Sequence, residues 1–136
     1  MDSGWTIEPL DATFGATVRD VHLASLDDAS FESLYRLWLD RALLIFPGQF
    51  LAKDEQIAFA QRFGQLEFEW GELSNVRSDG SLREDSAEDD MVQILKGNMG
   101  WHADSTYMAT QAKGAVFSAH VVPSQGGETG LSLIHI

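Results

Sequence analysis

His102 and Asp104 are the two residues whose types and spacing point most directly to chemistry. They stand two positions apart in the stretch Trp101-His102-Ala103-Asp104. In an extended strand, residues i and i+2 point to the same face, with their Cα atoms roughly 6.6 Å apart. One imidazole nitrogen and one carboxylate oxygen could therefore bind a single ion. Such a pair suits non-haem iron(II), in which two histidines and one carboxylate occupy one face of an octahedron.

The spacing of this pair is a weak signal when taken alone. Asp20-Val21-His22 has the same spacing in another predicted strand. A surface histidine beside a turn-forming aspartate is the alternative for His102 and Asp104. We expect structural roles for His22 and for His120, which alternates with apolar residues in a predicted strand.

The surrounding sequence strengthens the metal interpretation. Gly97-Asn98-Met99-Gly100-Trp101-His102-Ala103-Asp104-Ser105-Thr106-Tyr107 resembles the first iron-binding motif of the TauD/TfdA-type dioxygenases, which include taurine and dichlorophenoxyacetate dioxygenases. Val121-Val122-Pro123-Ser124-Gln125-Gly126-Gly127-Glu128-Thr129 resembles that family's Pro-containing turn followed by Gly-Gly-(Asp/Glu)-Thr. The segments 44–49 and 59–64 resemble the strand and helix that precede the catalytic barrel. The resemblance covers residues 5–129.

The resemblance implies a fold, a set of cofactors and a reaction. The fold would be α+β and β-rich, a partial double-stranded β-helix (jelly roll) with flanking N-terminal helices, forming a single domain over residues 1–136. His102 and Asp104 would bind iron(II), and Thr129 would hydrogen-bond the carboxylate of the co-substrate 2-oxoglutarate. Dioxygen would then be used to hydroxylate a small organic acid, such as a sulfonate, sulfate ester or aryloxyacetate, with release of succinate and carbon dioxide.

Two neighbouring residues, Asn98 and Tyr107, are weaker candidates for substrate contact. Tyr107 could line the substrate pocket. Asn98 could contact substrate, but the glycines around it make a structural role in a turn equally reasonable. Trp101 would point to the opposite face of a strand from His102, so we expect it to pack in the core. The pair Gly126-Gly127 predicts a turn with positive φ angles.

The end of the sequence departs from the family pattern. The family's third iron ligand, a second histidine, and the arginine that binds 2-oxoglutarate lie far beyond the first motif, whereas Ile136 lies 34 residues after His102. Residues 130–136 also depart from the pattern, and His135 is not expected to replace the missing ligand. We therefore expect a truncated chain that binds iron weakly, is inactive alone and aggregates readily.

Two alternatives remain open from the sequence. The chain could be a non-catalytic jelly-roll remnant or metal-binding module, or a zinc or manganese protein that uses the same two ligands. A second histidine followed by an arginine further along the source reading frame would favour the enzyme.

The remaining sequence predicts the elements that position this pair. Residues 6–10 and 16–21 are rich in β-branched residues and predict strands, Asp27-Asp28 predicts the start of a helix that continues to about Arg41, and residues 53–63 predict a second helix. The run 42–46 predicts a strand buried on both faces. Residues 74–90 predict a mobile surface loop, and 91–95 and 115–122 predict later strands. The expected buried helix positions are Phe31, Leu34, Tyr35, Trp38, Leu39, Ile57, Phe59, Ala60 and Phe63.

Composition narrows the partners. Nine Lys and Arg residues stand against 21 Asp and Glu residues, for a formal charge of −12. This balance argues against a surface that binds nucleic acid or an anionic membrane, because both need clustered cations. There is no cysteine, and the N-terminus lacks a basic-then-apolar signal. We expect a cytoplasmic protein that acts on a small molecule, with an oligomeric state that the sequence does not decide.

Overall fold

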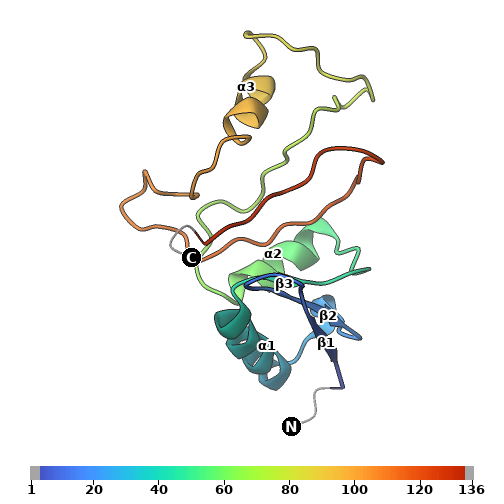
Figure 1. Ribbon diagram of the computed structural model, residues 1–136, viewed down its shortest axis with the longest axis vertical. Helices are drawn as coiled ribbons and strands as arrows, with labels where there is room; N and C mark the ends of the chain where they lie inside the picture. Colours follow the sequence, from blue (N-terminus) through green and yellow to red (C-terminus); the bar gives the residue numbers. More distant parts are fainter. Residues whose placement is uncertain (1–3, 134–136) are drawn as a thin grey trace. The chain divides into compact units, whose positions relative to one another are not determined.

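The computed structural model describes residues 4–133, and the chain forms two compact units. The first unit contains residues 4–59 and 116–133, and the second contains residues 60–115. The strands and the helix α1 (Asp28–Arg41) lie in the first unit and the helix α3 (Asp90–Gly97) in the second, whereas α2 (Lys53–Gln61) begins in the first unit and ends in the second. Figure 1 labels these elements.

The first unit is built on a small three-stranded sheet. β1 (Thr6–Pro9) pairs antiparallel with β2 (Ala16–Arg19), and β2 pairs in parallel with β3 (Leu44–Ile45). The first two strands confirm the predictions for 6–10 and 16–21. β3 is only two residues long and Ile45 is 43% exposed, so the prediction of a strand buried on both faces is wrong. An edge strand with one neighbour cannot be covered as a central strand would be.

Gly15 joins the sheet to the first helix. Its N–H donates to the Arg41 carbonyl over 2.9 Å, and its own carbonyl accepts from the Leu10 N–H over 3.1 Å. Its φ angle of +98° lies in a region that L side chains rarely adopt. A glycine is therefore required where the chain turns from β1 into β2.

The first helix, α1 (Asp28–Arg41), begins and ends where the sequence predicts. The Asp27 side chain accepts a hydrogen bond from the Ser30 N–H over 2.8 Å, which caps the helix. Leu34 is 1% exposed, as predicted, but Leu39 is 63% exposed, so the prediction that Leu39 is buried is wrong. The two residues are five positions apart, which rotates one about 140° from the other around a helix of 3.6 residues per turn.

The second helix, α2 (Lys53–Gln61), ends two residues before the predicted end, and Phe63 lies in the turn that follows. Phe59 is 5% exposed and its ring meets the ring of Phe31 edge-on, with centroids 6.3 Å apart. This contact joins α1 to α2 in the core of the first unit. The other buried residues of that core are Ala16, Val18, Val21, Leu23, Leu34 and Leu51, of which Leu23 begins the short 3-10 helix η1 (Leu23–Ser25).

The second unit contains one helix, α3 (Asp90–Gly97), where the sequence predicted a strand over 91–95. The Asp89 carboxylate accepts from the N–H groups of Met91 and Val92 over 3.1 and 3.3 Å and so caps the helix. Val92 is buried, whereas Ile94 is 48% exposed. A short apolar run fits either a helix or a strand, and the cap at Asp89 selects the helix.

The predicted strand over 115–122 is also absent. Within the part of the chain that the structure describes, this segment has no strand partner and is drawn without an arrow in Figure 1. Phe117 and Val121 are 76% and 81% exposed. The expected α+β class is confirmed, but the β-rich character is not found in residues 4–133. No helix in these residues is long and apolar enough to cross a membrane.

Candidate metal centre

His102 and Asp104 lie beyond the end of α3 in the second unit, in a stretch without regular secondary structure. The prediction that a strand carries them is therefore wrong. Their side chains nevertheless converge, because His102 Nε2 lies 3.1 Å from Asp104 Oδ1. Both side chains are accessible, with exposed fractions of 46% and 63%. A turn at residues 104–107 takes the place of the strand.

A backbone carbonyl orients the His102 ring. His102 Nδ1 lies 2.7 Å from the Gly100 carbonyl oxygen. A carbonyl oxygen only accepts hydrogen bonds, so Nδ1 must carry the proton in this contact. In a neutral imidazole the other nitrogen, Nε2, then presents its lone pair. Metal-binding histidines commonly donate their second ring N–H to such an acceptor.

The pair therefore fits a metal ion. If the ring is neutral and Nδ1 carries its proton, the Nε2 lone pair faces a carboxylate oxygen, and a cation bound by both atoms would stabilise that contact. Metal–ligand bonds of about 2.1 Å at a right angle would separate two neighbouring donor atoms by about 3.0 Å. The observed 3.1 Å between Nε2 and Oδ1 agrees with this value. A proton shared between the two atoms would also account for the spacing.

The backbone around Asp104 is held by two side chains that sequence reasoning did not identify. Ser105 has a φ angle of +58°, is 5% exposed and donates its hydroxyl hydrogen to the Glu67 carboxylate. Gln111 Nε2 donates to the Asp104 carbonyl over 3.3 Å. A residue other than glycine pays about 1–2 kcal/mol to adopt such a left-handed conformation. No sequence signal points to Glu67, which lies 38 positions from Ser105.

The other predicted site residues are exposed or lie in the first unit. Asn98 ends α3 and its N–H donates to the carbonyls of Ile94 and Lys96, which confirms a turn role for its backbone. Tyr107 is 83% exposed, and Trp101 is 76% exposed, so the expected core packing of Trp101 is wrong.

Thr129 belongs to the first unit and is exposed. The turn before it has the predicted positive φ angles, +73° at Gly126 and +75° at Gly127. In residues 4–133, no three His, Cys, Asp or Glu side chains lie close enough together to hold a metal ion. His135 lies outside the described residues.

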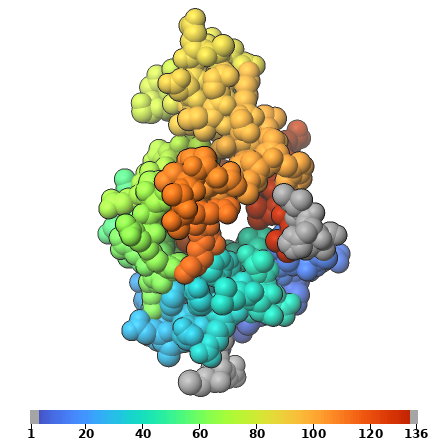
Figure 2. Space-filling view, turned by 90° about the vertical axis from the view of Figure 1, so that its left-hand side faces the viewer, coloured from blue at the N-terminus to red at the C-terminus, as the bar shows by residue number. Residues whose placement is uncertain are grey.

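The loop before α3 has more internal structure than a featureless surface loop. Val76 pairs with Leu82 in a β-bridge, and the Arg83 N–H donates to the Asn75 carbonyl over 2.7 Å. In the space-filling view, the yellow-green loop and the yellow-to-orange α3 are in contact (Figure 2). Whether the loop is mobile stays a prediction.

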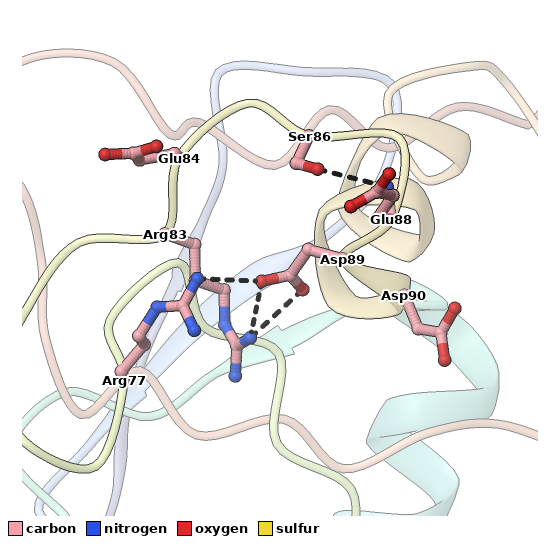
Figure 3. A pocket seen from close by; sticks show the side chains of 7 residues that line it. All are labelled: Arg77, Arg83, Glu84, Ser86, Glu88, Asp89 and Asp90. Atoms are coloured by element: carbon pink, nitrogen blue, oxygen red, sulfur yellow. Dashed lines mark hydrogen bonds and ion pairs between the residues drawn. The ribbon is translucent and has the colours of Figure 1, made fainter.

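Asp89 is the centre of this loop's polar network. Arg83 Nη1 donates to both of its carboxylate oxygens over 3.0 Å, and Arg77 Nη2 donates over 3.2 Å (Figure 3). Desolvation raises the pKa of Asp89, but the hydrogen bonds from Arg83 and the Val92 N–H, with the charges of Arg83 and Arg77, outweigh it and hold the pKa below its ordinary value.

A shallow hollow of about 500 Å³ surrounds Asp89, and its lining contains neither His102 nor Asp104. Both arginines in it already face the Asp89 carboxylate, and four carboxylates share the lining (Figure 3). Because both arginines are paired with Asp89 and carboxylates outnumber them, the charge of the lining does not favour an anionic ligand. The residues around the hollow are Arg77, Arg83, Glu84, Ser86, Glu88, Asp89 and Asp90.

Comparison with known families shows the ancestry of the chain. Residues 6–132 match the family described as taurine catabolism dioxygenase TauD, TfdA family. The chain belongs to the TauD/TfdA family. That match includes both His102 and Asp104 as well as Thr129.

Two curated TauD/TfdA-type relatives carry the name (S)-phenoxypropionate/alpha-ketoglutarate-dioxygenase. The chain is 64% identical to the protein from Sphingobium herbicidovorans over 97% of its length, and 56% identical to that from Delftia acidovorans over 95%. It is 35% identical, over 89% of its length, to the alpha-ketoglutarate-dependent 2,4-dichlorophenoxyacetate dioxygenase of Cupriavidus pinatubonensis. The chain spans about half the length of these relatives, 46% for the first two and 47% for the third.

A solved structure extends the comparison to the fold. The chain resembles the crystal structure of AAD-2 in complex with Mn(II) and N-oxalylglycine, with a TM-score of 0.70 and 27% sequence identity. The similarity covers 79% of this chain and 39% of that one.

Proposed function

We propose that His102 and Asp104 are two iron(II) ligands of a 2-oxoglutarate-dependent dioxygenase that hydroxylates an aryloxyalkanoic acid. The observation that carries the proposal is the 3.1 Å approach of His102 Nε2 to Asp104 Oδ1 within a family match that spans both residues. The substrate class follows the names of the relatives, which act on phenoxypropionate and dichlorophenoxyacetate. Of the three substrate classes that the sequence left open, namely sulfonates, sulfate esters and aryloxyacetates, the proposal retains only the last.

Each residue has a separate part in this proposal. Iron(II), 2-oxoglutarate and dioxygen would supply the oxidising chemistry, with succinate and carbon dioxide released. His102 and Asp104 bind the metal, and the Gly100 carbonyl keeps the proton on His102 Nδ1 so that Nε2 is free to bind. Thr129 offers a hydroxyl to a carboxylate of 2-oxoglutarate. Asn98 and Tyr107 remain candidates for substrate contact.

The wider setting is also part of the proposal. We propose that residues 1–136 belong to one domain, a partial jelly roll, in a cytoplasmic protein. The likeness to AAD-2 at a TM-score of 0.70 supports the fold. A cysteine-free sequence is compatible with a reducing compartment.

Binding of Mn(II) to the 136-residue chain tests the metal site directly, because free Mn(II) is counted by electron paramagnetic resonance. We expect His102→Ala and Asp104→Ala each to weaken binding at least tenfold. His22→Ala is the matched control, since His22 is also an exposed histidine but lies in the first unit. Equal affinity in all four proteins would show that the pair is not a metal site.

Turnover separates the enzyme from a metal-binding module. We keep the expectation that the 136-residue chain, given iron(II), 2-oxoglutarate and (S)-phenoxypropionate, releases no succinate, because the described residues offer two ligands where the family site needs three. Iron-dependent succinate release that His102→Ala abolishes would contradict this expectation and establish a complete site. Mn(II) binding without any 2-oxoglutarate dependence would favour the module.

A further inference from the structure

Glu67 contacts the residue that follows the metal ligand Asp104. The Ser105 hydroxyl donates to Glu67 Oε2, and both residues lie in the second unit. Ser105 is 5% exposed and is a buried polar residue, whereas Asp104 beside it is 63% exposed at its side chain. The chain is therefore anchored on one side of Asp104 by a hydrogen bond to a carboxylate.

This anchor holds an unfavourable backbone conformation. Ser105 has a φ angle of +58°, a left-handed conformation that a residue with a Cβ rarely adopts unless its surroundings enforce it. The Ser105 carbonyl also accepts from the Met108 N–H over 3.0 Å, which closes the turn. The direction in which the chain leaves Asp104 depends on this turn.

A second contact fixes Asp104 itself. Gln111 Nε2 donates to the Asp104 carbonyl over 3.3 Å. The peptide between Asp104 and Ser105 is thus held from both ends, by Gln111 at the carbonyl and by Glu67 through the neighbouring hydroxyl. With this peptide fixed, the Asp104 side chain has few directions left, and one of them brings Oδ1 to 3.1 Å from His102 Nε2.

We propose that Glu67 is a positioning residue for the metal ligand Asp104, acting through the Ser105 hydroxyl. The inference rests on the proposed function, since it assumes that His102 and Asp104 bind a metal ion. Glu67 is not a third ligand in residues 4–133, because no three His, Cys, Asp or Glu side chains there lie close enough together to hold a metal ion. Partners of this kind typically change metal affinity 10–100-fold when they are removed.

Mn(II) affinity of the 136-residue chain and its variants provides the test, with far-UV circular dichroism to monitor folding. We expect Glu67→Ala and Ser105→Ala each to weaken Mn(II) binding at least tenfold. Glu67→Gln keeps an acceptor for the Ser105 hydroxyl, so we expect it to bind within about threefold of the unmodified chain. Glu69→Ala is the control for loss of one negative charge, because Glu69 is exposed and two positions away.

The outcomes separate the two proposals. If Glu67→Ala binds Mn(II) as Glu69→Ala does while His102→Ala has lost binding, the positioning role is refuted and the metal site stands. If His102→Ala binds as well as the unmodified chain, the metal site and the positioning role both fail. A circular dichroism spectrum that collapses in Glu67→Ala, or a Glu67→Gln variant as weak as Glu67→Ala, would refute positioning through the Ser105 hydrogen bond.

Discussion

Replacing Leu34 with alanine should cost the first unit about 3 kcal/mol of unfolding free energy. Leu34 is 1% exposed, so the change removes three buried carbon atoms, worth about 2.4 kcal/mol at about 0.8 kcal/mol each, and leaves a cavity that adds to the loss. Leu39 lies on the same helix and is 63% exposed. Only about a third of its side chain is withdrawn from water, which predicts a loss below about 1 kcal/mol for Leu39→Ala.

Urea unfolding followed by circular dichroism at 222 nm measures both variants against the unmodified chain. With a slope of about 2 kcal/mol per molar urea, the two midpoints should differ by about 1 M. The comparison is well matched, because both variants change leucine to alanine in the interior of α1. Equal midpoints for Leu34→Ala and Leu39→Ala would refute the assignment of the buried face.

Three further changes probe the second unit and the sheet. Asp89→Ala removes the cap of α3 and the partner of both arginines, so we expect a smaller 222 nm signal and faster proteolysis within residues 74–90, whereas Glu88→Ala should change neither. Because the folded-state pKa of Asp89 is depressed, its contribution is present above the unfolded pKa and is lost as the pH falls through the lower folded pKa. Loss of α3 in an acid titration well above the ordinary aspartate range would contradict this sign. Gly15→Ala should lower the unfolding free energy measured in urea by about 1–2 kcal/mol, because a side chain at φ +98° is strained and its Cβ would lie 2.7 Å from Leu10 Cδ1. A loss no larger than that of the surface change Glu32→Ala would show that the turn tolerates a side chain.

The helices and the first two strands of residues 1–60 were predictable because their signals are local. Asp27 caps α1 through Ser30, three residues away, and β-branched residues mark β1 and β2. The later half was predicted less well because its signals depend on partners. Residues 91–95 fit two periodicities, and only the cap at Asp89 decides between them. A strand over 115–122 requires a neighbouring strand, and the residue types of this segment do not show whether such a neighbour is present.

The candidate site also has one part that the sequence predicts and another that it does not. Residue types, spacing and family resemblance predict that His102 and Asp104 form a metal-binding pair, and the 3.1 Å approach of their side chains is compatible with that prediction. The supporting contacts were not predictable. Glu67 meets Ser105 across 38 positions, and the left-handed φ angle of Ser105 follows no rule for serine. The acceptor for His102 Nδ1 is the Gly100 carbonyl oxygen. Every residue type has this main-chain atom, so the sequence does not show that it is the acceptor.

The main-chain origin of that acceptor affects how the site can vary among descendants of this gene. Every substitution at position 100 keeps a main-chain carbonyl there. An amino-acid substitution at this position therefore leaves in place the acceptor that keeps the proton on His102 Nδ1. A Cβ at position 100 would lie 3.7 Å from the Gly97 carbonyl oxygen, an ordinary contact, so the backbone can accept a side chain without moving. The side chain at position 100 can therefore change while the proton stays on His102 Nδ1. In contrast, a single substitution of Glu67 or Ser105 can remove the hydrogen bond between them.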